Sequence, residues 1–479
     1  MEGSCLVKEQ YQGISVAYRR REPEKTVLYQ VVQQNLETFL CRMREACPDH
    51  DPVPGYVENT FRSYLECGIM AHGFGRCFCP SCKQGFAVAY SCKTRGLCPS
   101  CNGKRMAITA AHIIDYVMPR VPVRQVVLSV PRRLRWYLHR DSNVVSGVLH
   151  VFLRALSTAL RRNSPEAPRE AKMGAVSFFH RGGSSLNVHP HFHNVVADGV
   201  FAAGNGRAVF YPATELCEDV WARLQETLRK RILKYFSRHG YLDDDVVQDM
   251  LLLEHGGGFS LHGAVRIDDS DREGQEKLLR YCARPVFSRD RLGWWNEQKQ
   301  QLVYQFQRPL PDGRTHEILS AMDLMKRLAE LIPPPWINMV RYCGALAPNA
   351  KIREQVVMLS GPSEALRQRL QQAAEEMGLD HHEDTLDSKT DSAKEKKDEA
   401  RKRASKTWAM LMARIFEFLP LICPRCGHEM KMVGFIVESE NVRKVLEHLE
   451  LPTKAPTPYP PRAPPQMDLE YEGTVDWLE

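Results

Sequence analysis

The stretch Asn187-Val188-His189-Pro190-His191-Phe192-His193-Asn194-Val195-Val196 decides the fold of the surrounding chain. Apolar and β-branched residues around alternating histidines predict a β-strand, whose alternate side chains share one face. His191 and His193 are therefore expected to point the same way. His180 ends a preceding apolar run, and the Gly- and Ser-rich segment 181–186 is typical of a turn. His180 would then reach the same point from the neighbouring strand.

Three imidazoles at one point form a site for a divalent metal. The alternative is that these are ordinary surface or core histidines. Two of them stand in strict alternation, and two more lie close by in the chain. This pattern favours the metal site.

A second pattern, residues 275–281 followed by Cys282-Ala283-Arg284-Pro285, predicts a short helix that Pro285 ends. It presents Tyr281 with Arg280 and Arg284 beside it. A tyrosine near a metal and arginines suits attack on a phosphodiester. The phenolate is the nucleophile, the metal polarises the phosphoryl oxygen and arginine binds the developing charge. Taken alone, the helix would favour a core tyrosine with solvated arginines.

Cysteines are concentrated between residues 67 and 101, in a chain whose N-terminus has no signal-peptide pattern. This favours metal thiolates over disulfides. Cys79-Pro80-Ser81-Cys82 and Cys98-Pro99-Ser100-Cys101 are two CxxC knuckles whose spacing predicts one tetrahedral, structural zinc site. The remaining candidates for a second zinc are Cys67, His72 and Cys92. A later pair, Cys423 and Cys426, is half a knuckle and a weak signal by itself.

Positive charge is gathered in the same part of the chain, although the whole chain has a formal net charge of only +7. A local basic surface is expected of a protein that faces phosphates, with a merely solvated face as the alternative. Basic residues beside Trp136 suit single-stranded DNA, unless Trp136 lies in the core. The residues expected to bind DNA are Lys83, Lys93, Arg95, Lys104, Arg105, Arg132, Arg133 and Arg135. Arg289, Arg291, Trp294 and Trp295 would extend this surface.

His191-Phe192-His193 matches the His-hydrophobe-His motif of the HUH endonucleases. Residues 174–201 and 278–292 resemble the rolling-circle transposases of the insertion-sequence "ninety-one" family. The resemblance also takes in the cysteine cluster and residues 124–135, 331–335, 341–349 and 423–427. It implies Mg²⁺ or Mn²⁺ as the catalytic metal, Cys67 and Cys92 as zinc ligands, and a 5′-phosphotyrosine intermediate that frees a 3′-OH.

The chain departs from this family in two places. Some relatives carry two catalytic tyrosines, whereas Tyr281 has no companion nearby, which implies a single-tyrosine mechanism. Many relatives have Gln where His180 stands, although some HUH relaxases use three histidines. A dimer is one way to organise two strand cleavages, and reuse of Tyr281 is another.

The order of elements predicts an α+β protein. Its core is an antiparallel sheet of HUH endonuclease type with helices covering one face, joined to an N-terminal helical and zinc-binding domain and a mostly helical C-terminal region. The expected divisions are a helical segment (1–60), a zinc-binding DNA-docking domain (61–110), a single-tyrosine nuclease domain (111–300), an accessory region (301–379), a charged linker (380–406), a helix with a CxxC knuckle (407–440) and an unstructured proline-rich tail (441–479).

These patterns predict a DNA transposase that moves its own element by single-strand cleavage and transfer, acting on single-stranded or hairpin ends. A plasmid relaxase or replication initiator would use the same chemistry. A non-catalytic zinc DNA-binding protein and a three-histidine zinc hydrolase are alternatives from other classes. The chain has no Walker A sequence and no apolar run of the ~20 residues of a membrane span. We therefore expect a cytoplasmic, nucleoid-associated bacterial protein without a membrane partner or need for ATP.

Overall fold

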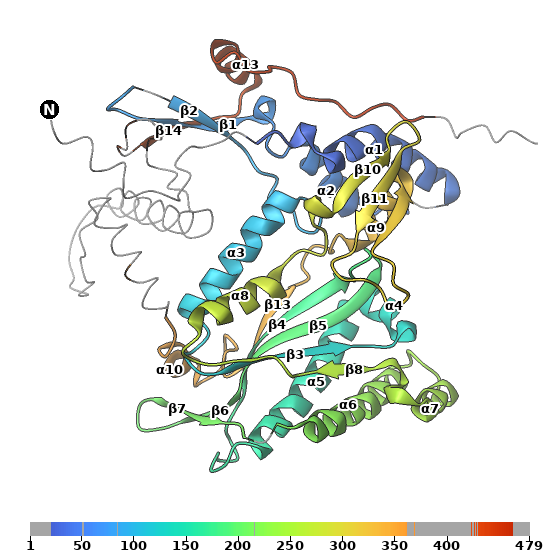
Figure 1. Cartoon of the computed structure of the whole chain (residues 1–479), viewed down its shortest axis with the longest axis vertical. Helices are drawn as coiled ribbons and strands as arrows, with labels where there is room; N and C mark the ends of the chain where they lie inside the picture. Colours follow the sequence, from blue (N-terminus) through green and yellow to red (C-terminus); the bar gives the residue numbers. More distant parts are fainter. Residues whose placement is uncertain are drawn as a thin grey trace, which may run out of the picture.

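The computed structural model describes residues 21–49, 52–83, 85–214, 216–361, 368, 423, 426, 428 and 430–462. The charged linker expected at 380–406 and the helix expected at 408–419 lie outside the described residues. Figure 1 shows the described part, with a central sheet, a group of helices below it and a second group of helices and short strands above it.

A six-stranded antiparallel sheet forms the centre of the molecule. Its order is β13 (Val340–Gly344), β4 (Gly174–Gly182), β5 (Val188–Ala197), β3 (Val123–Ser129) and β8 (Ser260–His262), with β9 (Arg266–Ile267) also paired to β3. The predicted α+β class with an antiparallel sheet is thus confirmed. β13 follows residue 300, so the sheet extends past the expected end of the nuclease domain.

Helices cover both faces of this sheet. They are α3 (Pro99–Tyr116), α4 (Arg132–Arg140), α5 (Ser142–Arg162), α6 (Glu218–Arg238) and α8 (Arg272–Ala283). Phe179 and Phe192 pack with α4, α5 and α6 on one face. Phe178 and Val195 pack with α3 and α8 on the other. The expectation of helices on one face is therefore wrong, because β4 and β5 present apolar side chains alternately to both sides.

By length and composition, α5 is the one helix among the described residues that could cross a membrane. Its apolar side chains, including Val148 and Phe152, are buried in the same core as Phe192 of β5 and Leu228 of α6. A core helix of a globular protein passes the same test of length and composition, so this finding is weak evidence for a membrane segment.

A second core joins the beginning of the chain to residues beyond 290. It contains α1 (Val27–Ala46), α2 (Gly55–Glu66), the sheet β10 (Leu292–Asn296), β11 (Gln301–Gln305) and β12 (His316–Ser320), and α9 (Ala321–Leu331). Smaller elements complete the fold: η1 (Pro23–Lys25), η2 (Met70–His72), β6 (Gly199–Ala203), β7 (Ala208–Pro212), α7 (Asp244–Leu252), η3 (His255–Gly258), η4 (Arg289–Arg291) and α10 (Arg353–Val357).

The end of the described chain returns to its beginning. The hairpin of β1 (Phe74–Phe78) and β2 (Gly85–Ala89) gains a third strand, β14 (Lys431–Ile436), and α13 (Ser439–His448) packs on η2 (Figure 1). The described residues beyond 300 therefore mix strands with helices and are not mostly helical. The tail expected to be unstructured runs along α1 as far as residue 462, where Tyr459 N donates to Gln33 O at 3.0 Å and Arg462 N to Thr38 Oγ1 at 3.0 Å.

Candidate active site

The three predicted histidines meet on the face of the sheet that α8 covers. His180 of β4 lies directly opposite His191 of β5, and His193 follows at the next position on the same side. One ring nitrogen from each lies within 4.8 Å of the other two. His191 Nε2 and His193 Nε2 are 3.1 Å apart. His189 is not part of this group.

Each histidine is held by a hydrogen bond that leaves one ring nitrogen facing the cluster. His191 Nδ1 donates to the His189 carbonyl at 2.7 Å, and His180 Nε2 donates to the Cys282 carbonyl at 2.6 Å. His193 Nδ1 lies 2.9 Å from the side-chain amide of Gln125 on β3. Such outer contacts fix the tautomer and orientation of metal-binding histidines. Gln125 was not anticipated as a site residue.

The three histidines are held in their neutral form. Burial, together with the other histidines and Arg284, lowers the pKa of His193 to about 2 and that of His180 to about 3. Burial also lowers the pKa of His191. All three rings are therefore neutral at physiological pH, which is the form that coordinates a metal. Three converging neutral imidazoles fit a divalent cation.

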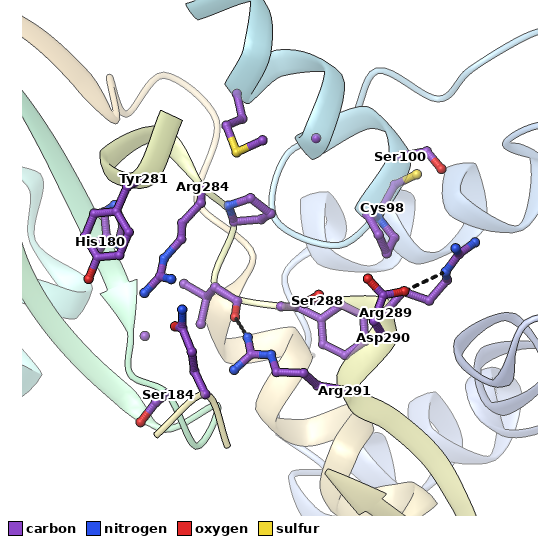
Figure 2. Close-up of a pocket in the computed structure, with 18 of the residues that line it drawn as sticks. Cys98, Ser100, His180, Ser184, Tyr281, Arg284, Ser288, Arg289, Asp290 and Arg291 are labelled. Carbon is purple, nitrogen blue, oxygen red and sulfur yellow. Dashed lines mark hydrogen bonds and ion pairs between the residues drawn. The ribbon is translucent and has the colours of Figure 1, made fainter. Parts of the chain in front are cut away.

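Tyr281 lies beside these histidines near the end of α8. Its side chain is 39% exposed, and its ring stands edge-on to His193 with 5.8 Å between centroids. Arg284 Cζ lies 4.2 Å above the tyrosine ring, and Figure 2 shows both side chains reaching into the same space as His180. Arg280, the other expected partner, instead forms an ion pair with Glu276 at 2.9 Å. The geometry thus brings Arg284, rather than Arg280, to the site.

Both the histidines and Tyr281 line a cleft of about 990 Å³. Four arginines and two acidic residues also line it: Arg21, Glu22, Arg284, Arg289, Asp290 and Arg291. Figure 2 shows the last four of these. The excess of positive charge suits a phosphate-containing ligand. Of the two tyrosines in the lining, Tyr64 is buried and burial raises its pKa well above the usual value. Tyr281 is the more exposed of the two tyrosines.

A first thiolate cluster forms the opposite wall of the cleft. It contains Cys67, Cys92, Cys98 and Cys101. Cys67 Sγ lies 3.6 Å from Cys98 Sγ and 3.7 Å from Cys101 Sγ, and Cys92 Sγ lies 3.5 Å from Cys101 Sγ. Four thiolates around one zinc ion would be about 3.8 Å apart, given Zn–S bonds of about 2.3 Å. The donor set fits structural zinc.

The two predicted CxxC knuckles do not share a zinc site. Cys79 and Cys82 lie near the turn of the β1–β2 hairpin, whereas Cys98 and Cys101 lie beyond its open end, so the hairpin separates them. Cys79 and Cys82 instead meet Cys423 and Cys426 in a second cluster. His72 is exposed and belongs to neither cluster.

The predicted DNA-binding residues differ in exposure and in their hydrogen bonds within the protein. Arg132 and Arg133 are exposed at the start of α4, directly after the strand that pairs with His191, and Trp136 is 58% exposed there rather than in the core. Arg95 instead donates to the carbonyls of Ile337 and Pro334 at 2.6 and 2.9 Å. Lys83 and Lys93 are exposed and have positive φ, and Lys104 lies on α3. Arg105 donates to the Lys93 carbonyl, and Arg135 donates to the Val130 carbonyl. Arg95 is thus occupied within the protein.

Comparison with known proteins agrees with this geometry. The family described as "Putative transposase" matches residues 174–354, which contain the histidines and Tyr281, and the "Transposase zinc-binding domain" matches residues 32–130. These matches define a transposase with a zinc-binding domain. The transposase for insertion sequence element IS801 from Pseudomonas savastanoi pv. phaseolicola is 24% identical over 298 residues, covering 60% of this chain and 70% of that protein. Together, the two family models and this relative support an IS91-family insertion-sequence transposase. No solved structure matches it.

Proposed function

We propose that this transposase cuts one DNA strand with Tyr281 as the nucleophile and transfers that strand through a covalent 5′-phosphotyrosine. The observation that carries the proposal is the position of Tyr281, exposed in the cleft and edge-on to His193. Tyr281 is thus accessible to a substrate and lies beside the three neutral histidines, where a nucleophile is needed. The proposal therefore assigns nucleophilic catalysis to this residue.

The reaction balances without an external energy source. The Tyr281 oxygen loses its proton to solvent and forms a bond to phosphorus, while the bond from phosphorus to the 3′-oxygen breaks. The departing oxygen takes up a proton and becomes a 3′-OH, the later nucleophile. Because the phosphotyrosine retains the energy of the phosphodiester, joining the strand to a new end requires no ATP.

The residues around Tyr281 take distinct roles in this scheme. Arg284 lies over the tyrosine ring, where its guanidinium can bind a phosphoryl oxygen as negative charge develops. His180, His191 and His193 would hold Mg²⁺ or Mn²⁺, which supplies polarisation of a phosphoryl oxygen when bound. The Cys282 carbonyl accepts a hydrogen bond from His180 at 2.6 Å, so the end of α8 is tied to the histidine strand. This tie orients the nucleophile.

A single strand is the substrate that we propose for the cleft. Arg289 and Arg291 continue the arginine lining beyond Arg284, and exposed Trp136 offers a surface for stacking an unpaired base. Arg140 lies over the Trp136 ring with Cζ 5.3 Å from its centroid. Cations beside an exposed aromatic ring are typical of single-strand binding, and single-stranded or hairpin ends of the element would supply the unpaired DNA.

The proposal is tested by adduct formation. Purified protein is mixed with single-stranded oligonucleotides from the ends of the element, with Mn²⁺ or EDTA, and resolved on a denaturing gel. We expect a Mn²⁺-dependent covalent band that Tyr281→Phe abolishes and His191→Ala weakens. Tyr116→Phe is the matched control, since Tyr116 is 64% exposed on α3 and is not among the residues that line the cleft.

Two results would redirect the assignment. Tight binding without an adduct on any correct end would favour a zinc DNA-binding protein without catalytic activity. Strand cleavage that survives Tyr281→Phe would move the nucleophile elsewhere, and if no adduct accompanied it, a three-histidine hydrolase would explain the products.

A further inference from the structure

The structure assigns a second zinc site that joins the β1–β2 hairpin to the C-terminal part of the chain. It is built from Cys79 and Cys82 together with Cys423 and Cys426. The matched zinc-binding domain ends at residue 130 and does not contain the later pair. We propose that this zinc fastens the segment of residues 430–462 to the β1–β2 hairpin. The inference concerns architecture and does not depend on the chemistry of Tyr281.

The sulfur geometry fits a tetrahedral metal. Cys79 Sγ lies 3.4 Å from Cys426 Sγ, and Cys82 Sγ lies 3.4 Å from Cys423 Sγ. All four sulfur atoms lie within 4.8 Å of one another. These separations are far longer than the roughly 2.05 Å of a disulfide and approach the spacing of about 3.8 Å that four thiolates adopt around zinc. Four thiolates select zinc or iron among common metals.

The backbone brings the two pairs together independently of any metal. β14 runs antiparallel to β1 with Phe78 opposite Lys431, so the residues before β14 reach the end of β1 where Cys79 begins. Cys423 N donates to the His428 carbonyl at 2.8 Å, so His428 lies next to the first cysteine of the later pair. The cluster is partly shielded, since Cys79 and Cys423 are buried.

Apart from the pairing of β14 with β1 and the hydrogen bonds to α1, the described C-terminal segment is attached through a small apolar contact. Val433 and Phe435 of β14 are 61% and 64% exposed, so one side of this edge strand buries little apolar surface. Its apolar attachment comes mainly from Val442 and Leu446 of α13, which pack against a small core around Phe74. A metal held by both cysteine pairs would add to this attachment a covalent-strength link between the hairpin and the C-terminal segment.

Zinc content of the purified full-length chain provides the test, measured by mass spectrometry as the change from the parent protein. We expect Cys423→Ser/Cys426→Ser to lose one zinc per chain and Cys79→Ser/Cys82→Ser to lose one. The variant that combines all four substitutions should also lose only one, because both pairs belong to the same site. Cys217→Ser, at an exposed cysteine outside both clusters, should lose none.

Limited proteolysis provides a second measurement that a general folding failure would not reproduce. In the Cys423→Ser/Cys426→Ser variant, cleavage should release residues 430–462 at least tenfold faster than in the parent, while the zinc of the other cluster is retained. Unchanged zinc content in that variant, or a loss of two ions when all four cysteines are replaced, would overturn the shared site. Equal proteolysis rates with and without the metal would overturn its role as a fastening.

Discussion

Replacing Gln125 by leucine should weaken metal binding at the histidine cluster by about 10- to 100-fold, or about 1.4 to 2.7 kcal/mol. Gln125 is 6% exposed, and its amide nitrogen is placed 2.9 Å from His193 Nδ1 and 3.4 Å from Cys282 Sγ. If His193 binds a cation through Nε2, its Nδ1 carries a proton and requires an acceptor. A rotated Gln125 amide presents its oxygen there.

The magnitude follows from what leucine removes. An isosteric apolar side chain leaves a buried N–H without a partner, which costs about 1 to 3 kcal/mol and penalises the metal-bound tautomer. Gln125→Glu should instead keep or tighten binding, because a carboxylate accepts the same hydrogen bond and raises the basicity of the imidazole. The stability of the fold should change less than the metal affinity, because the two glutamine contacts lie at the cluster.

Calorimetric titration with Mn²⁺ measures this effect directly. Ser177→Ala is the matched control, because Ser177 lies on β4 of the same sheet and donates to the Asn194 side chain on the opposite face. Its loss should leave the Mn²⁺ dissociation constant unchanged. The reasoning would be refuted if Gln125→Leu bound Mn²⁺ as tightly as the parent, or if Ser177→Ala weakened binding equally.

Three further predictions concern separate regions. Burial and the charge of Arg181, whose Nη2 donates to the His139 ring at 3.0 Å, lower the pKa of His139 to about 4. Between pH 6.5 and 4, therefore, the unfolded chain binds more protons at this residue than the folded chain does. The free energy of unfolding should therefore fall as the pH is lowered from 6.5 to 4. In pH-dependent thermal melts, His139→Gln should reduce this loss by about 2 kcal/mol. Trp136→Ala should weaken single-stranded DNA binding by about 1 to 3 kcal/mol in anisotropy titrations, whereas Leu252→Ala, at a site that is 81% exposed on α7, should have no effect. Gly344→Ala should destabilise the protein by about 2 kcal/mol or more in denaturant titrations, because Gly344 has φ +63° and an added Cβ would collide with a backbone carbonyl oxygen.

Local patterns predicted the elements that carry the site. Alternating apolar residues and histidines predicted the β4–β5 hairpin, and in the structure His180 and His191 lie opposite each other. The helix ended by Pro285 appears as α8 and presents Tyr281 to the cleft. These predictions succeeded because strand alternation and helix termination depend on residues within a few positions of one another.

Long-range pairing could not be predicted in the same way. The two knuckles have a spacing typical of one zinc site, but the hairpin between Cys82 and Cys98 directs them to different partners. The partner of Cys79 and Cys82 arrives more than 300 residues later, through the pairing of β14 with β1. Gln125 could have been found from the sequence, since it is a polar residue in an apolar strand, and a buried polar side chain needs a hydrogen-bond partner.

The arrangement of α3 connects the zinc-binding part of the chain to the proposed chemistry. Its first turn contains Cys101 of the first thiolate cluster, and Ile113 farther along packs in the same core as Leu279 of α8 (Figure 1). Ser100 lines the cleft opposite Tyr281. α3 therefore contributes to one wall of the cleft at its first turn and packs farther along on the helix that carries Tyr281. Part of the matched zinc-binding region thus lines the same cleft as Tyr281.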